Sequence, residues 1–200
     1  REINFKQITM KKLVIFLLFT SLVMQGQGNV TVSNGKSITI KKEGSITMTQ
    51  NFSNNGTVTL NSDSNEFSSI IVGGTSTGNI IYNRYVNIAG ANEWDLIGSP
   101  VSGLTINSFI TETNNAATIA TNSSSYAVGS YDNTLDTWTN ATASTAGNLN
   151  VGQGYQMATT NGATLAFTGT VATGNQTVAV QNNDAANAGA GRRWNLVANP

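Results

Sequence analysis

The strongest constraint on the fold is a short pattern that occurs three times near the N-terminus. Each time, a turn containing glycine precedes a segment in which serine or threonine alternates with an aliphatic residue, at 37–40, 45–48 and 57–60. This period of two places the aliphatic side chains on one face of a strand and the hydroxyl groups on the other. The turn spacing of 9 to 12 residues fits either the rungs of a β-solenoid or an antiparallel meander. We therefore predict a stack of short strands over residues 29–73, with both arrangements open.

The following residues, 74–172, also have the pattern of short strands. The segment 80–86 carries aliphatic or aromatic side chains on both faces of the expected strand. This pattern predicts an interior strand of a two-layer structure. Tyr131 and Trp138 flank an Asp-Asn-Thr-Leu-Asp turn, which predicts a β-hairpin closed by an aromatic pair. We expect an all-β chain in which a β-sandwich-like unit at 74–172 follows the strand stack.

Composition agrees with strands rather than helices. Only 10% of the residues are charged, where an ordinary soluble domain has about 25%. The chain is instead rich in threonine, asparagine and glycine, and it lacks a sustained helical periodicity. Long helices are therefore not expected, and 111–148 is a low-complexity stretch that we expect to supply loops around the hairpin.

Both prolines of the chain end the same short phrase. Trp-Asp-Leu-Ile-Gly-Ser-Pro occupies 94–100, and Trp-Asn-Leu-Val-Ala-Asn-Pro occupies 194–200. Proline lacks the N–H that a strand ladder uses, so each phrase predicts a strand that stops there. The repeat predicts that 173–200 forms the first or closing strands of a related second unit. We expect this second unit to be truncated at residue 200.

The beginning of the chain has the pattern of an export signal. Met10 and two lysines precede a run of mostly apolar residues up to Met24, and small residues follow at 26–28. A run this short is typical of a signal peptide rather than of a membrane span, which needs about 20 residues. We predict upstream translated sequence at 1–9, a signal peptide at 10–28 that engages the secretion machinery, and a secreted mature chain without a transmembrane segment.

Composition also excludes several kinds of chemistry. The chain contains no cysteine and no histidine, which removes thiol nucleophiles, disulfides and Ser-His-Asp triads. Residues 85–191 contain no lysine or arginine, which argues against binding to nucleic acid.

Two short patterns could suggest catalysis. Ser76 lies in a Gly-x-Ser-x-Gly sequence, but the chain has no histidine to act as its base. Glu93 and Asp95 could form a carboxylate pair, yet arginine and asparagine replace them in the second phrase. We therefore expect a protein that is not an enzyme and has no catalytic residues.

Two weak candidate sites remain, both at the expected hairpin. Asp132 and Asp136 flank its turn and could hold Ca²⁺, although aspartates in such positions more commonly cap the turn. Tyr131 and Trp138 could stack on a sugar ring, although packing is the commoner role of such aromatics. Apart from this calcium alternative, no metal or cofactor is expected.

The chain resembles secreted surface proteins of Bacteroidetes, especially flavobacteria, that leave the cell by the type IX secretion system. The residues that carry the resemblance are 55–60, 77–85, 94–102, 152–155, 167–169 and 194–200. The resemblance implies a β-rich stalk or adhesin-like chain and a C-terminal sorting domain of the type A class beyond residue 200. It supplies no catalytic residues.

These observations favour an extracellular structural or adhesive module on the outer cell surface, which presents an uncharged surface to a glycan or a cell-surface partner. The alternative is a carbohydrate-binding accessory module of an enzyme that degrades polysaccharides.

Overall fold

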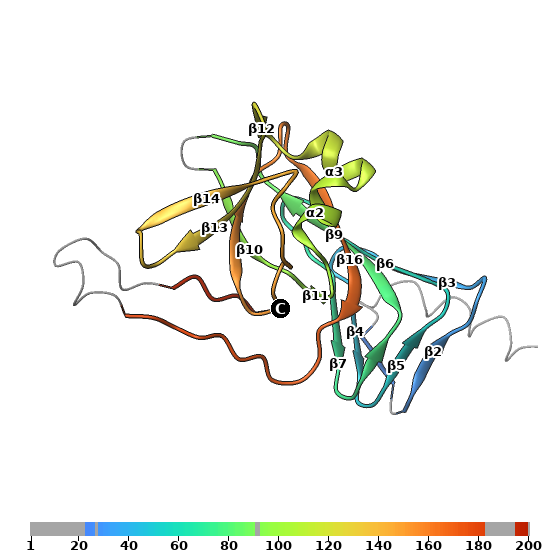
Figure 1. Ribbon diagram of the computed structural model, residues 1–200. Coiled ribbons are helices and arrows are strands. Elements are labelled where there is room, and N and C mark those ends of the chain that lie inside the picture. The colour runs from blue at the N-terminus through green and yellow to red at the C-terminus, as the bar shows by residue number, and fades with distance from the viewer. Residues whose placement is uncertain (1–22, 27, 91–92, 183–194, 200) are drawn as a thin grey trace, which may run out of the picture.

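The computed structural model describes residues 23–26, 28–90, 93–182 and 195–199. Residues 10–22 and 27 of the predicted signal peptide, together with Trp194 and Pro200 of the second phrase, lie outside the described residues, whereas residues 23–26 of the predicted signal peptide form a strand. The described residues fold into β-strands with two helices of six residues each, which confirms the all-β prediction (Figure 1).

The N-terminal part is built from nine short strands. They are β1 (Val23–Gly26), β2 (Val30–Val32), β3 (Ser37–Ile40), β4 (Ser45–Met48), β5 (Phe52–Asn54), β6 (Thr57–Asn61), β7 (Ser69–Val72), β8 (Ser76–Thr77) and β9 (Asn79–Val86). These strands stack as β1-β4-β7, β2-β5-β8 and β3-β6-β9, and every one of these pairings is parallel. The strand stack is therefore a β-solenoid with three faces and not a meander.

The register explains why the sequence alone left both arrangements open. Strands β3 and β6 stack directly, with Ile38 opposite Val58 and Ile40 opposite Leu60, whereas β4 belongs to a different face. The three similar segments thus do not form one sheet. They turn around a common interior, in which Ile40, Leu60 and Met48 of β4 are buried.

Strand β9 joins the solenoid to the rest of the molecule. One edge of β9 pairs in parallel with β6, and the other pairs antiparallel with β16 (Ala163–Val171) over eight residues. This arrangement confirms the interior strand predicted at 80–86. Residues 74–86, which we expected to open the next unit, are the third rung of the solenoid, so the solenoid extends past residue 73.

The second part is an antiparallel half-barrel. Its strands are β10 (Asp95–Gly98), β11 (Val101–Ser102), β12 (Thr121–Asn122), β13 (Ser125–Asp132), β14 (Thr137–Thr142), β15 (Gly154–Met157) and β16. One sheet has the order β10-β15-β13-β12, with β14 also on β13, and β11 pairs with β16 in the sheet shared with the solenoid. A core that includes the stacked rings of Phe109 and Phe167 is continuous with the solenoid interior.

Thr159 connects the sheet that contains β15 to the residues that follow β9 in the shared sheet. Its backbone N–H donates to the carbonyl of Asn87 at 2.8 Å, and its carbonyl accepts from Ala89 at 2.8 Å. Its hydroxyl lies 2.9 Å from the carbonyl oxygens of Val86 and Asn87 and accepts from the N–H of Gly162 at 3.0 Å. Thr159 is fully buried, so its own polar groups have no access to water.

Replacing Thr159 by valine is expected to lower the free energy of unfolding by about 2 kcal/mol, because the isosteric side chain leaves buried polar groups without partners. Chemical denaturation measures this loss. The matched control is Thr164→Val on β16, where the side chain is exposed and the expected change is below about 0.5 kcal/mol. Equal losses in the two variants would contradict the role of the Thr159 hydroxyl.

The low-complexity stretch contains more regular structure than we expected. Helix α2 (Ile106–Thr111) ends at its first residue, and α3 (Thr113–Thr118) and strands β12, β13 and β14 lie within it. Asn115 of α3 is fully buried and hydrogen-bonds to the backbone of Ala166 on β16. Much of 111–148 is therefore part of the folded body rather than a presenting loop.

Described residues from both copies of the repeated phrase hydrogen-bond to the segment that contains β15. Strand β10, from the first copy, pairs antiparallel with β15, and Ile97 lies opposite Tyr155. In the second copy, Val197 forms an antiparallel bridge with Gln153 just before β15. Residues 196–198 thus add to a sheet of the first unit, where we expected strands of a separate second unit.

Candidate functional site

The predicted hairpin is present as strands β13 and β14. Tyr131 and Trp138 lie opposite each other in the register, and their ring centroids are 5.3 Å apart at a tilt of 54°. Cross-strand aromatic pairs of this kind stabilise a hairpin, which gives both residues a structural role. The prediction of a hairpin closed by these two aromatics is confirmed.

The two aspartates of the turn are engaged within it. One carboxylate oxygen of Asp132 accepts from the N–H groups of Thr134 at 2.8 Å and Leu135 at 3.1 Å. The Tyr131 hydroxyl donates to Asp136 at 2.6 Å. Asp136 has a φ of 56°, a left-handed conformation that aspartate tolerates better than most residues. Both side chains thus cap or brace the turn, and in the described part of the chain no group of three or more aspartate or glutamate residues is placed to hold a metal ion.

A polar depression lies beside this turn, and we call it the hairpin hollow. It has a volume of about 810 Å³ and lies between the start of the hairpin turn, the residues before β15 and the segment after β16. Its lining consists of Ser130, Tyr131, Asp132, Asn133, Thr134, Asn150, Val151, Gln153, Gly154, Gln176, Thr177, Val178, Ala179, Gln181, Asn195 and Leu196. Amides and hydroxyls dominate this surface, and they both donate and accept hydrogen bonds.

The hairpin hollow contains two of the four predicted candidates. Tyr131 and Asp132 line it, whereas Trp138 and Asp136 do not. The amides of Asn150, Gln153 and Gln176 were not predicted. Asn150 and Gln153 come from one segment and Gln176 from another, more than 20 residues away, and a single amide has no motif that would reveal it.

Tyr155 fixes the loop that forms one wall of the hollow. Its hydroxyl accepts from the N–H of Asn150 at 2.8 Å and lies 3.3 Å from the carbonyl of Asn148. Burial raises the pKa of the Tyr155 phenol, with a smaller opposing effect from the Asn150 hydrogen bond. The phenol therefore stays protonated at neutral pH and can donate to Asn148 while it holds Asn150.

Asp95 and its repeat counterpart Asn195 have the same structural role. Asp95 accepts from the backbone N–H of Asn87 at 2.8 Å and from its side-chain amide at 3.0 Å. Asn195 accepts from the N–H of Gln181 at 2.9 Å and donates to the carbonyl of Gln181 at 2.9 Å. Each side chain thus ties its strand to a preceding segment, which explains why aspartate and asparagine replace each other.

In the described part of the chain, none of the helices has the length and apolar character needed to cross a membrane. A search among curated proteins and a search among solved structures each found no match to this chain. One family model matches residues 9–200, which is nearly the whole sequence. The chain therefore belongs to the family described as "Domain of unknown function (DUF8693)".

Proposed function

We propose that this domain is a non-catalytic extracellular module with a structural or adhesive role in a secreted or cell-surface protein. The observation that carries the proposal is the continuous sheet β11-β16-β9-β6-β3, which makes the solenoid and the half-barrel one scaffold. Such a scaffold holds the hairpin in a fixed position relative to the solenoid. The export signal predicted at 10–28 supports a location outside the cell.

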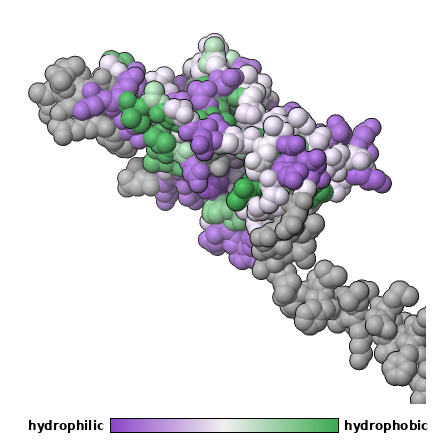
Figure 2. Space-filling view, turned by 90° about the horizontal axis from the view of Figure 1, so that it is seen from below, coloured by the Kyte–Doolittle hydropathy of each residue, from purple (hydrophilic) through white to green (hydrophobic). Residues whose placement is uncertain are grey.

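The surface chemistry supports contact with uncharged partners. In the view of Figure 2, hydrophilic residues cover much of the surface and apolar residues form separate patches between them. With only 10% charged residues, this polarity comes mainly from amides and hydroxyls. These groups suit a glycan or another neutral polar surface better than a polyanion.

A second candidate function is a carbohydrate-binding accessory module of a polysaccharide-degrading enzyme. The observation that favours it is the hairpin hollow, where Tyr131 and several residues with amide side chains line one concave surface. Sugar sites combine an aromatic face with side chains that donate and accept hydrogen bonds. In this case the hollow would select one polysaccharide.

Binding of the secreted chain to a glycan array, and to cells and abiotic surfaces, separates the two functions. The structural or adhesive role predicts retention on cells or abiotic surfaces without selective binding to one sugar. The accessory role predicts selective binding to one polysaccharide that Tyr131→Ala weakens by about tenfold. Leu135→Ala is the matched control, because Leu135 is 63% exposed in the same turn and does not line the hollow.

A companion assay tests the absence of catalysis. The chain is incubated with esters and polysaccharides, and no turnover is expected. Turnover that Ser76→Ala or Glu93→Gln abolishes would overturn the proposal of a non-catalytic module.

A further inference from the structure

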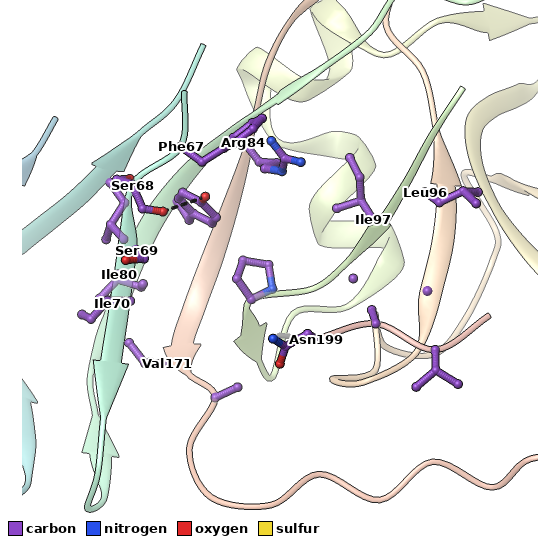
Figure 3. A pocket seen from close by; sticks show the side chains of 18 of the residues that line it. Phe67, Ser68, Ser69, Ile70, Ile80, Arg84, Leu96, Ile97, Val171 and Asn199 are labelled. Carbon is purple, nitrogen blue, oxygen red and sulfur yellow. Dashed lines mark hydrogen bonds between the residues drawn. The ribbon is translucent and has the colours of Figure 1, made fainter. Parts of the chain in front are cut away.

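A second cavity, distinct from the hairpin hollow, lies between the solenoid and the half-barrel. It has a volume of about 530 Å³, within the range of small-molecule sites. Aliphatic side chains form much of its walls, among them Leu60, Ile70, Ile80, Ile97, Val171 and Leu196, and polar residues form the rest. Figure 3 shows Ile70 and Ile80 on one side of this cavity and Ile97 and Leu96 on the other. We call it the interface cavity.

Arg84 places a positive charge in this apolar surrounding. It is the only basic residue between positions 43 and 191. Its guanidinium lies over the Phe67 ring, 3.7 Å from the ring centroid (Figure 3). Stacking on an aromatic face holds the guanidinium in place.

The structure provides no acceptor for part of this guanidinium. Nη1 of Arg84 is buried and has no hydrogen-bond partner among the described residues. Asp95 is close enough to influence the pKa of Arg84, but its carboxylate binds Asn87. Burial is the largest influence on the pKa of Arg84 and lowers it, yet the guanidinium remains charged at neutral pH.

Ser68, which also lines the interface cavity, carries a second unsatisfied group. It is only 4% exposed, and its Oγ has no hydrogen-bond partner among the described residues. Its backbone carbonyl accepts from the Tyr82 hydroxyl at 3.0 Å, which fixes the segment that carries it. Buried polar groups in folded proteins normally have partners, so two such groups in one cavity indicate a ligand that supplies acceptors.

We propose that the interface cavity binds an aliphatic monocarboxylate, with the carboxylate at Arg84 and Ser68 and the hydrocarbon chain along the aliphatic walls. One guanidinium matches the single charge and the planar geometry of a carboxylate. The aliphatic part of the walls suits an alkyl chain. This site is independent of the proposed adhesive function, because it shares only Gly154 and Leu196 with the lining of the hairpin hollow.

Isothermal titration of the chain with octanoate and with 1-octanol tests this proposal. Octanoate is expected to bind with a Kd of about 0.1 mM or tighter, and octanol at least about tenfold more weakly, because only octanoate carries the acceptor charge. This comparison uses the unaltered protein, so its outcome does not depend on any variant folding. Equal affinities, or no binding of octanoate up to about 5 mM, would overturn the proposal.

Two variants locate the site. Arg84→Met keeps the length and apolar stem of the side chain and is expected to weaken octanoate binding by about tenfold or more, whereas octanol binding stays unchanged. Ser68→Ala is expected to weaken octanoate binding by about threefold without lowering thermal stability, because the lost hydroxyl has no partner in the free protein. Lys41→Met is the matched control at an exposed lysine outside the cavity. Octanoate binding that is the same in Arg84→Met as in the wild type would contradict this assignment.

Discussion

Replacing Asn115 by aspartate is expected to lower the free energy of unfolding by about 4 kcal/mol at neutral pH. The Asn115 amide donates to the carbonyls of Phe109 at 2.9 Å and Ala166 at 3.0 Å, and its oxygen accepts from the N–H of Ala166 at 2.7 Å. Aspartate has nearly the same shape but no amide donor, so a buried carboxylate would face two carbonyl oxygens. The loss therefore measures hydrogen bonding and charge rather than packing.

The pH dependence of this variant follows from the same contacts. Burial beside two carbonyl oxygens raises the pKa of the introduced carboxyl group in the folded state above its unfolded value. The folded variant then takes up a proton at a higher pH than the unfolded chain does. Its deficit relative to the wild type should shrink as the pH falls from about 7 to about 4. Urea denaturation at several pH values measures this change.

The control for this experiment is the neighbouring residue. Asn114→Asp makes the same chemical change on the same helix, but Asn114 is exposed. Its expected effect is within about 0.5 kcal/mol. Similar losses in the two variants would show that the three hydrogen bonds of Asn115 do not stabilise the contact between α3 and β16.

Replacing Gly78 by alanine is expected to destabilise the solenoid by about 3–5 kcal/mol. Gly78 lies between β8 and β9 with a φ of +77°, and an added Cβ would overlap the backbone carbonyl of Asn54. Asn54 is itself buried, and its side chain donates to the carbonyl of Asn79 at 2.5 Å and accepts from Gly56 at 3.0 Å. The backbone of the second rung therefore has little freedom to move away.

A second glycine with the same backbone conformation isolates the steric part of this effect. Gly103 has a φ of +78°, and an added Cβ there would meet nothing within 4 Å. Gly103→Ala should cost only the conformational penalty of about 1 kcal/mol. Thermal and chemical denaturation of the two variants compare the costs directly. A cost for Gly78→Ala no larger than that for Gly103→Ala would mean that the third rung does not pack tightly on the second.

The strand and hairpin predictions succeeded because they rest on local periodicity. The alternation at 37–40 and 57–60 requires one buried and one exposed face, and the Tyr131–Trp138 pair requires only a short turn between two strands. The candidate site was predicted less completely. Tyr131 and Asp132 were found from their place in the turn, but Gln153 and Gln176 reach the hairpin hollow through contacts between distant segments.

The roles of three residues in packing or in the proposed cavity site were not predicted, and the reason is the same for all three. Asn115 lies in a low-complexity stretch, Thr159 is one of many threonines, and Arg84 is a single charge in a strand. Their roles depend on partners more than ten residues away or on burial against another sheet. Residue type and spacing alone do not distinguish such a residue from a solvent-exposed one.

The sequence by itself determined that the chain is all-β, where most of its strands lie, and that histidine and cysteine chemistry is absent. It did so because strand periodicity, turn residues and composition are local properties. Only the tertiary structure decided between solenoid and meander, placed both copies of the repeated phrase on one sheet, and brought Arg84 and Ser68 to one cavity. Strand pairing and burial depend on contacts between residues that are distant in the sequence, and a period of two is the same in parallel and antiparallel sheets.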